Sequence, residues 1–294
     1  MLPDLSIDWL KQRLTGDKGF VWIKRELTPA IEDKIMQLGI PGLDFLTESK
    51  RFYPGGNEAA HIVGAVNIDN QGIAGMEKAM DDEDVALLQQ VGLARGNELA
   101  PVNLSIDLRV QHVMHDVLTD ALSRYRAAAA AGAMMDIKTG EILGLVSLPD
   151  FDPNNPGSAL QKDTFNRMTA GIYELGSTMK SVTIAGALDS GKVKITDTFD
   201  ARFGVRFGRF TITDFHGTNR ILTLPEVYKY SSNDGAIHIM QQWGKENFRA
   251  FLHKMQFDVP EPLELPERRN PVVPMTFSEI VAATASFGHG LSLS

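Results

Sequence analysis

The chain has 294 residues, of which 43% are hydrophobic and 22% charged, with a formal net charge of −8 at pH 7 and no Cys. This is the composition of a globular protein long enough for two domains. It excludes disulfides and thiolate metal sites, and an acidic chain without a basic run argues against a nucleic-acid partner.

The N-terminus carries neither the basic region nor the apolar core of a signal peptide. It begins Met1-Leu2-Pro3-Asp4. The most apolar window, 127–135, is too short and too rich in Ala to span a bilayer. The sequence therefore predicts that the chain as given is soluble; if it belongs at a membrane, the anchor is missing from it.

The first hundred residues combine short helices with Gly-rich turns. Helices are expected at 7–14 and at 29–38, the second after Thr28 at an N-cap-like position. The acidic cluster 81–84 lacks the Gly and Glu that would follow in a calcium loop, and we interpret it as a solvated turn.

The organisation changes near residue 100. Residues 104–107 are strand-like and end in a helix cap, and 108–126 have apolar residues at a clear 3.6-residue period. Two apolar runs at 131–135 and 141–148, joined by 136–140, predict a β-hairpin.

The C-terminal half is predicted to be mainly helical. Apolar residues at helical spacing run from Ser177 to Leu188, and Ser190-Gly191 ends the pattern. Further helices are expected at 224–230, 236–243, 247–255 and 276–286. Residues 203–215, in which Phe alternates with Gly and Arg, are predicted to form exposed extended chain.

Ser177 and Lys180 carry the chemistry of this half. They are three residues apart near the start of a helix, and residues at that spacing share a helix face. A hydroxyl nucleophile then lies beside a candidate base, provided that burial or a nearby cation lowers the pKa of the lysine.

The pattern alone also has an ordinary structural interpretation, with Ser177 as an N-cap and Lys180 in solvent. Ser-x-x-Lys occurs by chance about once in a few hundred residues. The stretch Ser231-Ser232-Asn233 changes the balance, because a second serine can relay a proton and an asparagine can grip a substrate amide.

Ser-x-x-Lys followed by Ser-x-Asn is the order found in β-lactamases and penicillin-binding proteins. The chain resembles the class B penicillin-binding proteins, which are monofunctional peptidoglycan D,D-transpeptidases, and it fits the division type best. Segments outside the motifs share the resemblance: 51–54, 59–64, 72–77, 104–111, 219–227 and 287–292.

The resemblance implies a role for each motif residue. Ser177 would be the acyl nucleophile and Lys180 its base. Ser231 would relay a proton between Lys180 and the leaving amine, and Asn233 would hydrogen-bond the donor peptide or the side chain of a β-lactam. Ser177, Ser231 and Asn233 would contact substrate. The Ser177 backbone N–H would be one of two oxyanion donors.

The implied fold is α+β. Residues 1–100 would be part of an N-terminal pedestal (dimerisation) module. Residues 101–294 would be the N-terminal part of a penicillin-binding/β-lactamase-like transpeptidase domain, with an antiparallel sheet flanked by helices.

Three departures from the family qualify this expectation. The string Lys138-Thr139-Gly140 precedes the nucleophile, so we interpret it as a hairpin turn, and the third motif of the family would lie beyond Ser294. Asp234 adds a carboxylate beside Asn233, where it would either disturb the substrate or point away. The membrane helix and the start of the pedestal module are missing, so we expect a fragment of a longer gene product.

Two kinds of function follow. The first is peptidoglycan cross-linking by serine acyl transfer on D-Ala-D-Ala stem peptides, with β-lactams acylating the same serine. The alternative is a catalytically incomplete fragment or a scaffold of the cell-wall machinery. A β-lactamase or β-lactam sensor shares the Ser-Lys chemistry, but the pedestal-like first hundred residues argue against it.

No cofactor or metal is implied, and His61, His216 and His289 lack ligand spacing. Expected partners are peptidoglycan stem peptides, β-lactams and, through the pedestal, membrane proteins of the divisome or elongasome. The resemblance places the parent protein in the cytoplasmic (inner) membrane, facing the periplasm.

Overall fold

The computed structural model describes residues 2–16, 18–82 and 101–294, which divide into two compact units. Unit 1 comprises Met1–Phe52 with Ile68–Asn70, and unit 2 comprises Tyr53–Asn67 with Gln71–Ser294. The predicted domain boundary near residue 100 falls at the edge of 83–100, outside the described residues, and stays a prediction. Glu83 and Asp84 of the acidic cluster also lie there, whereas Asp81 and Asp82 end a helix.

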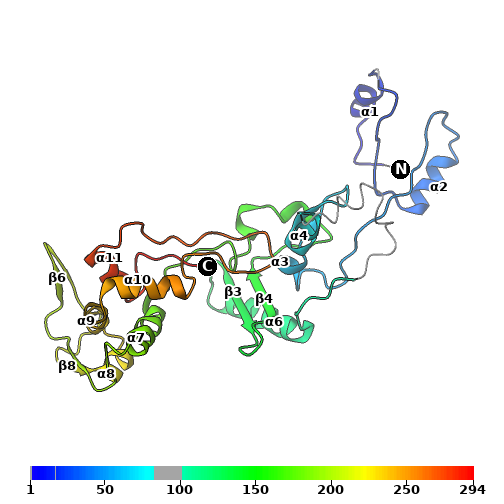
Figure 1. Cartoon of the computed structure of the whole chain (residues 1–294). Helices are drawn as coiled ribbons and strands as arrows, with labels where there is room; N and C mark the ends of the chain where they lie inside the picture. Colours follow the sequence, from blue (N-terminus) through cyan, green and yellow to red (C-terminus); the bar gives the residue numbers. More distant parts are fainter. Residues whose placement is uncertain (1, 17, 83–100) are drawn as a thin grey trace. The chain divides into compact units, whose positions relative to one another are not determined.

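The helices and strands follow one another along the chain as drawn in Figure 1. In order they are α1 (Ile7–Leu14), α2 (Pro29–Met36), α3 (Ala60–Val63), β1 (Ala65–Val66), β2 (Gly72–Ala74), α4 (Gly75–Asp82), α6 (Leu108–Arg124), β3 (Ala130–Met135), β4 (Ile142–Leu148), the 3-10 turns η1 (Pro156–Ser158), η2 (Lys162–Thr164) and η3 (Gly176–Thr178), then α7 (Met179–Asp189), β5 (Thr198–Asp200), β6 (Val205–Phe207), β7 (Phe210–Ile212), β8 (Ile221–Thr223), α8 (Leu224–Lys229), α9 (Asn233–Trp243), α10 (Lys245–Lys254) and α11 (Glu279–Ala285). Within the described ranges, no helix combines the length and the apolar character needed to cross a bilayer.

Unit 1 contains the two predicted helices. Ser6 caps α1 by accepting a hydrogen bond from the Trp9 backbone N–H at 3.1 Å. Thr28 occupies the N-cap position of α2 but forms no side-chain cap bond, and Pro29 begins the helix instead, where its missing N–H costs nothing. Ile35 is the one buried apolar side chain among the described residues of this unit.

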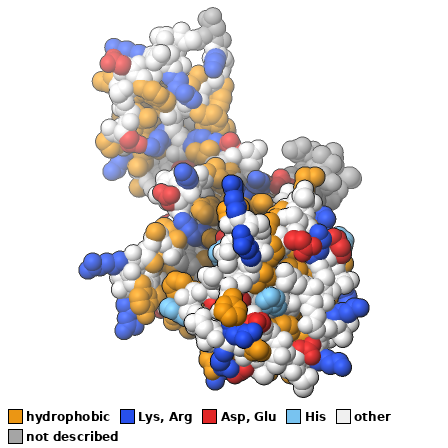
Figure 2. Space-filling view, turned by 90° about the vertical axis from the view of Figure 1, so that its left-hand side faces the viewer, with side chains coloured by type: hydrophobic (Ala, Val, Ile, Leu, Met, Phe, Trp, Pro, Cys, Tyr) orange, Lys and Arg blue, Asp and Glu red, His pale blue; other side chains and the backbone are white. Residues whose placement is uncertain are grey.

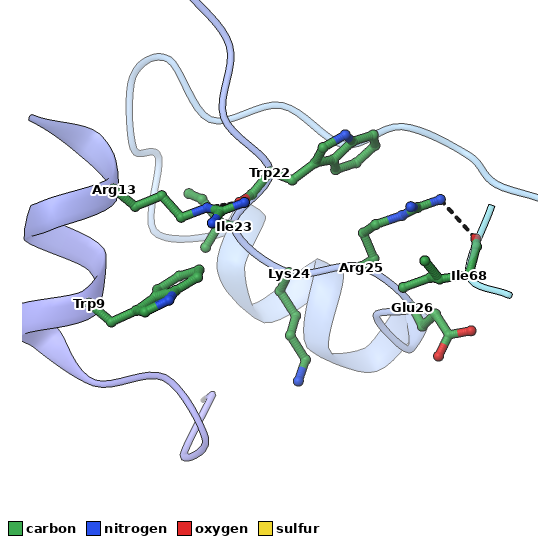
Figure 3. Close-up of a pocket in the computed structure, with 8 residues that line it drawn as sticks. All are labelled: Trp9, Arg13, Trp22, Ile23, Lys24, Arg25, Glu26 and Ile68. Carbon is green, nitrogen blue, oxygen red and sulfur yellow. Dashed lines mark hydrogen bonds between the residues drawn. The ribbon is translucent and has the colours of Figure 1, made fainter. Parts of the chain in front are cut away.

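Stacked aromatic and cationic side chains hold unit 1 together in place of an apolar core. The Arg13 guanidinium lies over the Trp9 ring, 5.0 Å from its centroid, and its Nε donates to the Trp22 carbonyl at 3.0 Å. Arg25 lies over the Trp22 ring and donates to the Ile68 carbonyl at 3.0 Å (Figure 3). These groups surround a pocket of about 460 Å³ lined by Trp9, Arg13, Trp22, Ile23, Lys24, Arg25, Glu26 and Ile68.

In unit 2, β3 and β4 form the predicted hairpin. They pair antiparallel from Ala130 opposite Leu148 to Met135 opposite Ile142. Helix α6 packs on this two-stranded sheet, and β4 is buried along most of its length, whereas Met134 and Met135 of β3 are 47% and 53% exposed. The expectation of an antiparallel sheet with a flanking helix is therefore met by this one hairpin.

Gln111 joins α6 to the sheet from a buried position. Its side-chain Nε2 donates to the Leu145 carbonyl at 2.9 Å and to the Glu58 carbonyl at 2.6 Å, and its Oε1 accepts the Leu145 N–H at 2.8 Å. The side chain is 1% exposed. One amide thus satisfies backbone groups of two segments far apart in the sequence.

Two predicted segments differ in the structure. Residues 104–107 do not form a strand: only the Asp107 N–H bonds to the Leu143 carbonyl, and the Ser105 hydroxyl takes the Ile142 carbonyl, so no backbone ladder develops. The cap was predicted correctly, since Asp107 accepts the Arg109 N–H. The exposed segment 203–215 folds into a two-stranded ribbon, β6 with β7, around a turn at Gly208.

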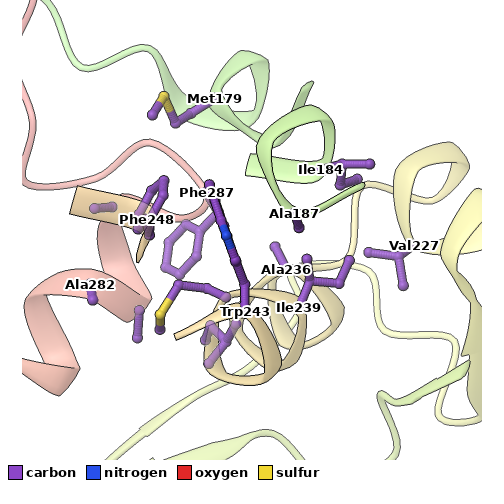
Figure 4. Close-up of a cluster of buried hydrophobic side chains, with 14 of the residues drawn as sticks. Met179, Ile184, Ala187, Val227, Ala236, Ile239, Trp243, Phe248, Ala282 and Phe287 are labelled. Atoms are coloured by element: carbon purple, nitrogen blue, oxygen red, sulfur yellow. The ribbon is translucent and has the colours of Figure 1, made fainter. Parts of the chain in front are cut away.

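The main apolar core of unit 2 lies between α7, α9, α10 and α11 (Figure 4). Trp243 is at its centre, with its ring 5.4 Å from that of Phe251 and 5.6 Å from that of Phe248. A Cβ at Gly186 of α7 would come within 2.4 Å of the Trp243 ring, so the close approach of α7 to α9 requires glycine there. This core fixes α7 and α9 against each other.

Side chains of opposite character alternate on the face over α8, α9 and the β6–β7 ribbon. Seen from that side, apolar and basic side chains lie next to each other (Figure 2). Arg209 lies over the exposed Phe210 ring at 5.2 Å, and Arg202 lies over Phe203 at 5.3 Å while pairing with Asp200 at 2.8 Å. In and beside the ribbon, two Arg side chains therefore stack on exposed Phe rings at the surface.

We predict that Gln111→Met destabilises the protein by roughly 2–4 kcal/mol, because the buried backbone groups of Leu145 lose their partners while side-chain volume is kept. Urea unfolding followed by circular dichroism measures this. The exposed Gln241→Met is the matched control and should change stability by less than about 0.5 kcal/mol. Equal effects of the two substitutions would contradict the bridging role of Gln111.

Candidate active site

Ser177 lies in the 3-10 turn η3, which runs directly into α7. Gly176 precedes it with a φ of 55°, a backbone conformation that glycine adopts without strain, and this sharp turn starts the helix. At the other end, Ser190 and Gly191 (φ 69°) terminate α7. The predicted helix and the placement of Ser177 near its start are therefore confirmed, with Ser177 in the 3-10 turn that precedes α7.

The side chain of Lys180 is buried among oxygen atoms from two parts of the chain. Its Nζ lies 3.2 Å from Ser177 Oγ, 3.0 Å from Ser231 Oγ and 2.8 Å from Asn233 Oδ1, and it donates to the Ser231 carbonyl at 2.5 Å. The residue is 1% exposed. The structure thus brings together the four residues that the motifs single out.

The same burial alters the charge of the lysine. Loss of hydration lowers the pKa of Lys180 from 10.5 to about 8, and the Asp214 carboxylate partly opposes this by favouring the ammonium. About a tenth of the molecules then hold a free amine at pH 7. The condition under which Lys180 could act as a base is met by desolvation, without a second cation.

The second motif lies at the junction of α8 and α9. Ser231 has a φ of 55°, in the left-handed region that non-glycine residues seldom adopt. Ser232 then caps α9 by accepting the Gly235 N–H at 2.9 Å, and Asn233 is the first residue of the helix. The tight junction turns both the carbonyl and the hydroxyl of Ser231 toward Lys180.

Asp214, after β7, is a site residue that the sequence did not reveal. Its Oδ2 accepts the Ser232 hydroxyl at 2.7 Å, and its Oδ1 accepts the backbone N–H groups of Asn233 and, at 3.0 Å, Asp234. A carboxylate at a helix N-terminus is a recognisable signal. Here it comes from 18 to 20 residues upstream, so no local pattern exposes it.

Asp234 points into the protein. It is 3% exposed, and its Oδ1 has no hydrogen-bond partner within the described part of the chain. Burial, with a smaller contribution from the Asp214 carboxylate, raises the pKa of Asp234 to about 6. Of the two possibilities left by the sequence, a buried carboxylate fits the one in which Asp234 points away from a bound substrate.

The turn that carries Ser177 is bonded to the segment 287–293. The Gly176 N–H donates to the Gly288 carbonyl at 3.1 Å, and Glu174 Oε1 accepts the Gly290 N–H at 2.7 Å. Tyr173 pairs antiparallel with Leu293. A Cβ at Gly288 would come within 2.0 Å of the Gly176 carbonyl oxygen, so this contact is backbone against backbone.

Lys138-Thr139-Gly140 forms the turn between β3 and β4, as predicted. Its hydrogen bonds stay within the turn, where Asp136 Oδ1 accepts the Lys138 N–H at 2.7 Å and the Thr139 hydroxyl donates to Glu141 at 3.0 Å. Elsewhere, His61 is buried with its Nε2 2.7 Å from the Thr164 carbonyl oxygen. The described residues contain no group of three or more His, Asp or Glu that could hold a metal ion.

We predict that Asp234→Asn stabilises the protein at pH 7.5 by roughly 1–3 kcal/mol. Because the pKa of Asp234 is raised in the folded state, the contribution of its protonated carboxyl to folding stability is fully present below the unfolded-state pKa of 3.8. That contribution is lost as pH rises through the folded-state pKa of about 6. The advantage of the variant should therefore disappear by about pH 4.

Thermal unfolding of wild type and variant across this pH range measures the effect. Asp120→Asn, at an exposed position on α6, is the control and should show little change at any pH. A stability difference that does not depend on pH would contradict the assignment to Asp234.

Known proteins similar to this chain include penicillin-binding transpeptidases. The family model described as "Penicillin binding protein transpeptidase domain" matches residues 130–294. "Probable peptidoglycan D,D-transpeptidase FtsI" of Caulobacter vibrioides is 36% identical over 293 residues, which cover 100% of this chain and 48% of that protein. "Probable peptidoglycan D,D-transpeptidase PenA" of Neisseria gonorrhoeae is 32% identical over 313 residues, covering 100% and 54%. The chain thus spans about half the length of these curated relatives.

Solved structures share the fold. Apo penicillin-binding protein 3 from Mycobacterium tuberculosis matches with a TM-score of 0.70 and 24% identity, over 83% of this chain and 56% of that one. The same protein complexed with aztreonam matches with a TM-score of 0.70 and 25% identity, over 84% and 56%. The mixed helices and strands of unit 2 are those of the transpeptidase fold, and the chain belongs to the penicillin-binding protein transpeptidase family.

Proposed function

We propose that this chain carries the nucleophile and base of a serine D,D-transpeptidase that cross-links peptidoglycan and is acylated by β-lactams. The main support is the contact of 3.2 Å between Lys180 Nζ and Ser177 Oγ, together with a pKa of about 8 for the lysine. The names of the relatives and of the family support the substrate class: D-Ala-D-Ala stem peptides.

The proposed reaction has two halves. The free amine of Lys180 takes the proton of the Ser177 hydroxyl as Oγ attacks the carbonyl carbon between the two D-Ala residues. The tetrahedral intermediate collapses, the C–N bond breaks, and Ser231 passes a proton from Lys180 to the departing D-Ala amine. An acceptor amine of a second stem then attacks the acyl-enzyme, loses its proton through the same residues and restores Ser177.

Asn233 is proposed to bind the donor peptide with its amide nitrogen. Its Oδ1 is occupied by Lys180 at 2.8 Å, whereas the one partner of Nδ2 among the described residues is the Thr213 carbonyl, at a long 3.4 Å. Nδ2 is therefore the group able to donate to a substrate carbonyl or to a β-lactam side chain. The Ser177 backbone N–H, at the start of α7, is the proposed oxyanion donor, since helix N-termini favour developing negative charge.

The larger assignments are also proposals. We assign residues 1–100 to part of a pedestal module and 101–294 to the N-terminal part of the transpeptidase domain. The parent protein would be anchored in the cytoplasmic membrane, face the periplasm and contact divisome or elongasome proteins through the pedestal. The support is the division-type resemblance and the half-length overlap with peptidoglycan transpeptidases.

The first test is covalent labelling with a fluorescent penicillin. Ser177→Ala should abolish labelling, because the acylated atom is removed, and Lys180→Ala should slow it by at least about a hundredfold, because the base is lost. Intact mass spectrometry locates the adduct. Ser181→Ala, an exposed hydroxyl on the same helix, is the control and should label like the wild type. Labelling that persists in Ser177→Ala, or a folded wild type that never labels, would contradict the proposed function.

The second test is the pH dependence of acylation. The base is the free amine, so the second-order rate constant should rise about tenfold per pH unit below the Lys180 pKa and level off above it. That pKa is about 8, lowered mainly by burial. Stopped-flow measurement from pH 6 to 9, corrected for spontaneous β-lactam hydrolysis, gives the profile. A rate constant that is flat across this range would rule out Lys180 as the titrating base.

A further inference from the structure

We propose that Asp214 is a positioning residue of this site, whose carboxylate holds the loop Ser231–Asn233 against Lys180. The proposal rests on the proposed function for its catalytic readout and on the structure for the rest. Asp214 lies outside both motifs, directly after the β6–β7 ribbon.

Both oxygens of the Asp214 carboxylate are used, and their donors are consecutive residues at the start of α9, from Ser232 to Asp234. Ser232 Oγ donates to Oδ2 at 2.7 Å, and the N–H groups of Asn233 and Asp234 donate to Oδ1. The N–H groups of a first helical turn have no partner inside the helix, and the helix dipole there favours an anion. Three consecutive residues are thereby fixed to one rigid group.

This attachment explains how the unusual backbone of Ser231 persists. A φ of 55° costs a non-glycine residue free energy and survives only where neighbouring contacts determine it. Asp214 accepts a hydrogen bond from Ser232, the residue after Ser231. Lys180 Nζ donates to the Ser231 carbonyl at 2.5 Å and lies 3.0 Å from Ser231 Oγ. Without the carboxylate the loop can relax, and both oxygens would leave the amine.

The β6–β7 ribbon delivers Asp214 to this position. Val205 pairs with Ile212 at its open end, and the Thr213 carbonyl contacts Asn233 Nδ2 at 3.4 Å. A Cβ at Gly204 (φ 68°) would come within 2.6 Å of the Ile212 carbonyl oxygen, so the ribbon closes only with glycine there. The ribbon thus has a function at the site besides covering the surface.

Asp214 also acts on the charge of the site. Within the described part of the chain, its charge acts on Lys180 of α7, whose ammonium it favours, and on Asp234 of α9, whose ionisation it disfavours. The other atoms around the lysine amine are the uncharged oxygens of Ser177, Ser231 and Asn233. Removing the Asp214 charge should therefore lower the pKa of Lys180, whereas a residue that only stabilised the fold would leave it unchanged.

The experiment compares Asp214→Asn, which keeps the shape and removes the charge, with Asp214→Ala, which removes the anchor. Asp200→Asn is the control, since that carboxylate pairs with Arg202 at the surface. The titration of Lys180 is followed by NMR on protein labelled with 13Cε-lysine, with the resonance assigned from Lys180→Ala. Acylation by fluorescent penicillin is measured from pH 6 to 9, and amide hydrogen exchange is measured at Asn233 and Asp234.

In Asp214→Asn, the Lys180 midpoint should fall by roughly 0.5–1 pH unit and the acid limb of acylation should move with it. In Asp214→Ala, exchange at both amides should accelerate and acylation should slow at least about tenfold, with Asp214→Asn restoring part of the rate. Asp200→Asn should match the wild type in all three measurements.

The outcomes separate this proposal from the proposed function. If the folded wild type is not acylated, the proposed function fails, while the lysine titration and the amide exchange still test Asp214. An unchanged Lys180 midpoint in Asp214→Asn overturns the electrostatic role. Unchanged exchange in Asp214→Ala overturns the anchoring role. If that variant does not fold, Asp214→Ser, which also removes the carboxylate but keeps a polar side chain, takes its place, and unchanged exchange in it overturns the role in the same way.

Discussion

The site depends on the burial of the Lys180 amine, to which no carboxylate is bonded within the described ranges. Moving an ammonium out of water is costly unless other polar groups replace its hydration. Lys180 meets this requirement with oxygens of Ser177, Ser231 and Asn233. These oxygens come from two separate segments. The positions of α7 and of the α8–α9 junction relative to each other must therefore be fixed for the lysine to keep its hydrogen bonds.

Two sets of contacts in unit 2 fix these positions. The apolar core around Trp243 holds α7 to α9, with Gly186 permitting close contact. The Asp214 carboxylate, which lies outside that core, holds the first turn of α9. Apolar packing sets where the helices lie, and the polar contacts set where the reactive groups point. The two kinds of interaction are complementary, since packing alone would not select the left-handed backbone of Ser231.

The local part of this arrangement could be predicted from the sequence. Ser177 and Lys180 share a face of one helix, so their proximity follows from helix geometry, and the β3–β4 hairpin follows from its apolar runs and turn. Ser231 and Asn233 were found through the resemblance, because nothing local brings them to Lys180. Neither helix geometry nor the resemblance identified Asp214, because it is the pairing of β6 with β7 that brings Asp214 to the start of α9.

The errors have the same origin. Residues 104–107 have a strand-like pattern, yet a strand needs a partner along its length, and only Asp107 finds a backbone bond on β4. The orientation of Asp234, which the sequence left open, likewise depended on what surrounds α9, and the residues next to it in the chain do not encode this. Where an outcome depended on contacts within about one helical turn the sequence sufficed, and where it depended on distant segments it did not.

The contact of Gly176 with Gly288 has a mechanical consequence. Two backbones that touch without intervening side chains leave no soft layer to absorb displacement, so the turn before the nucleophile and the strip 287–293 move as one piece. A displacement of this turn is therefore passed along main-chain bonds to the Tyr173–Leu293 bridge and, through the adjoining Ser292, to the bridge that Ser292 forms with Val272.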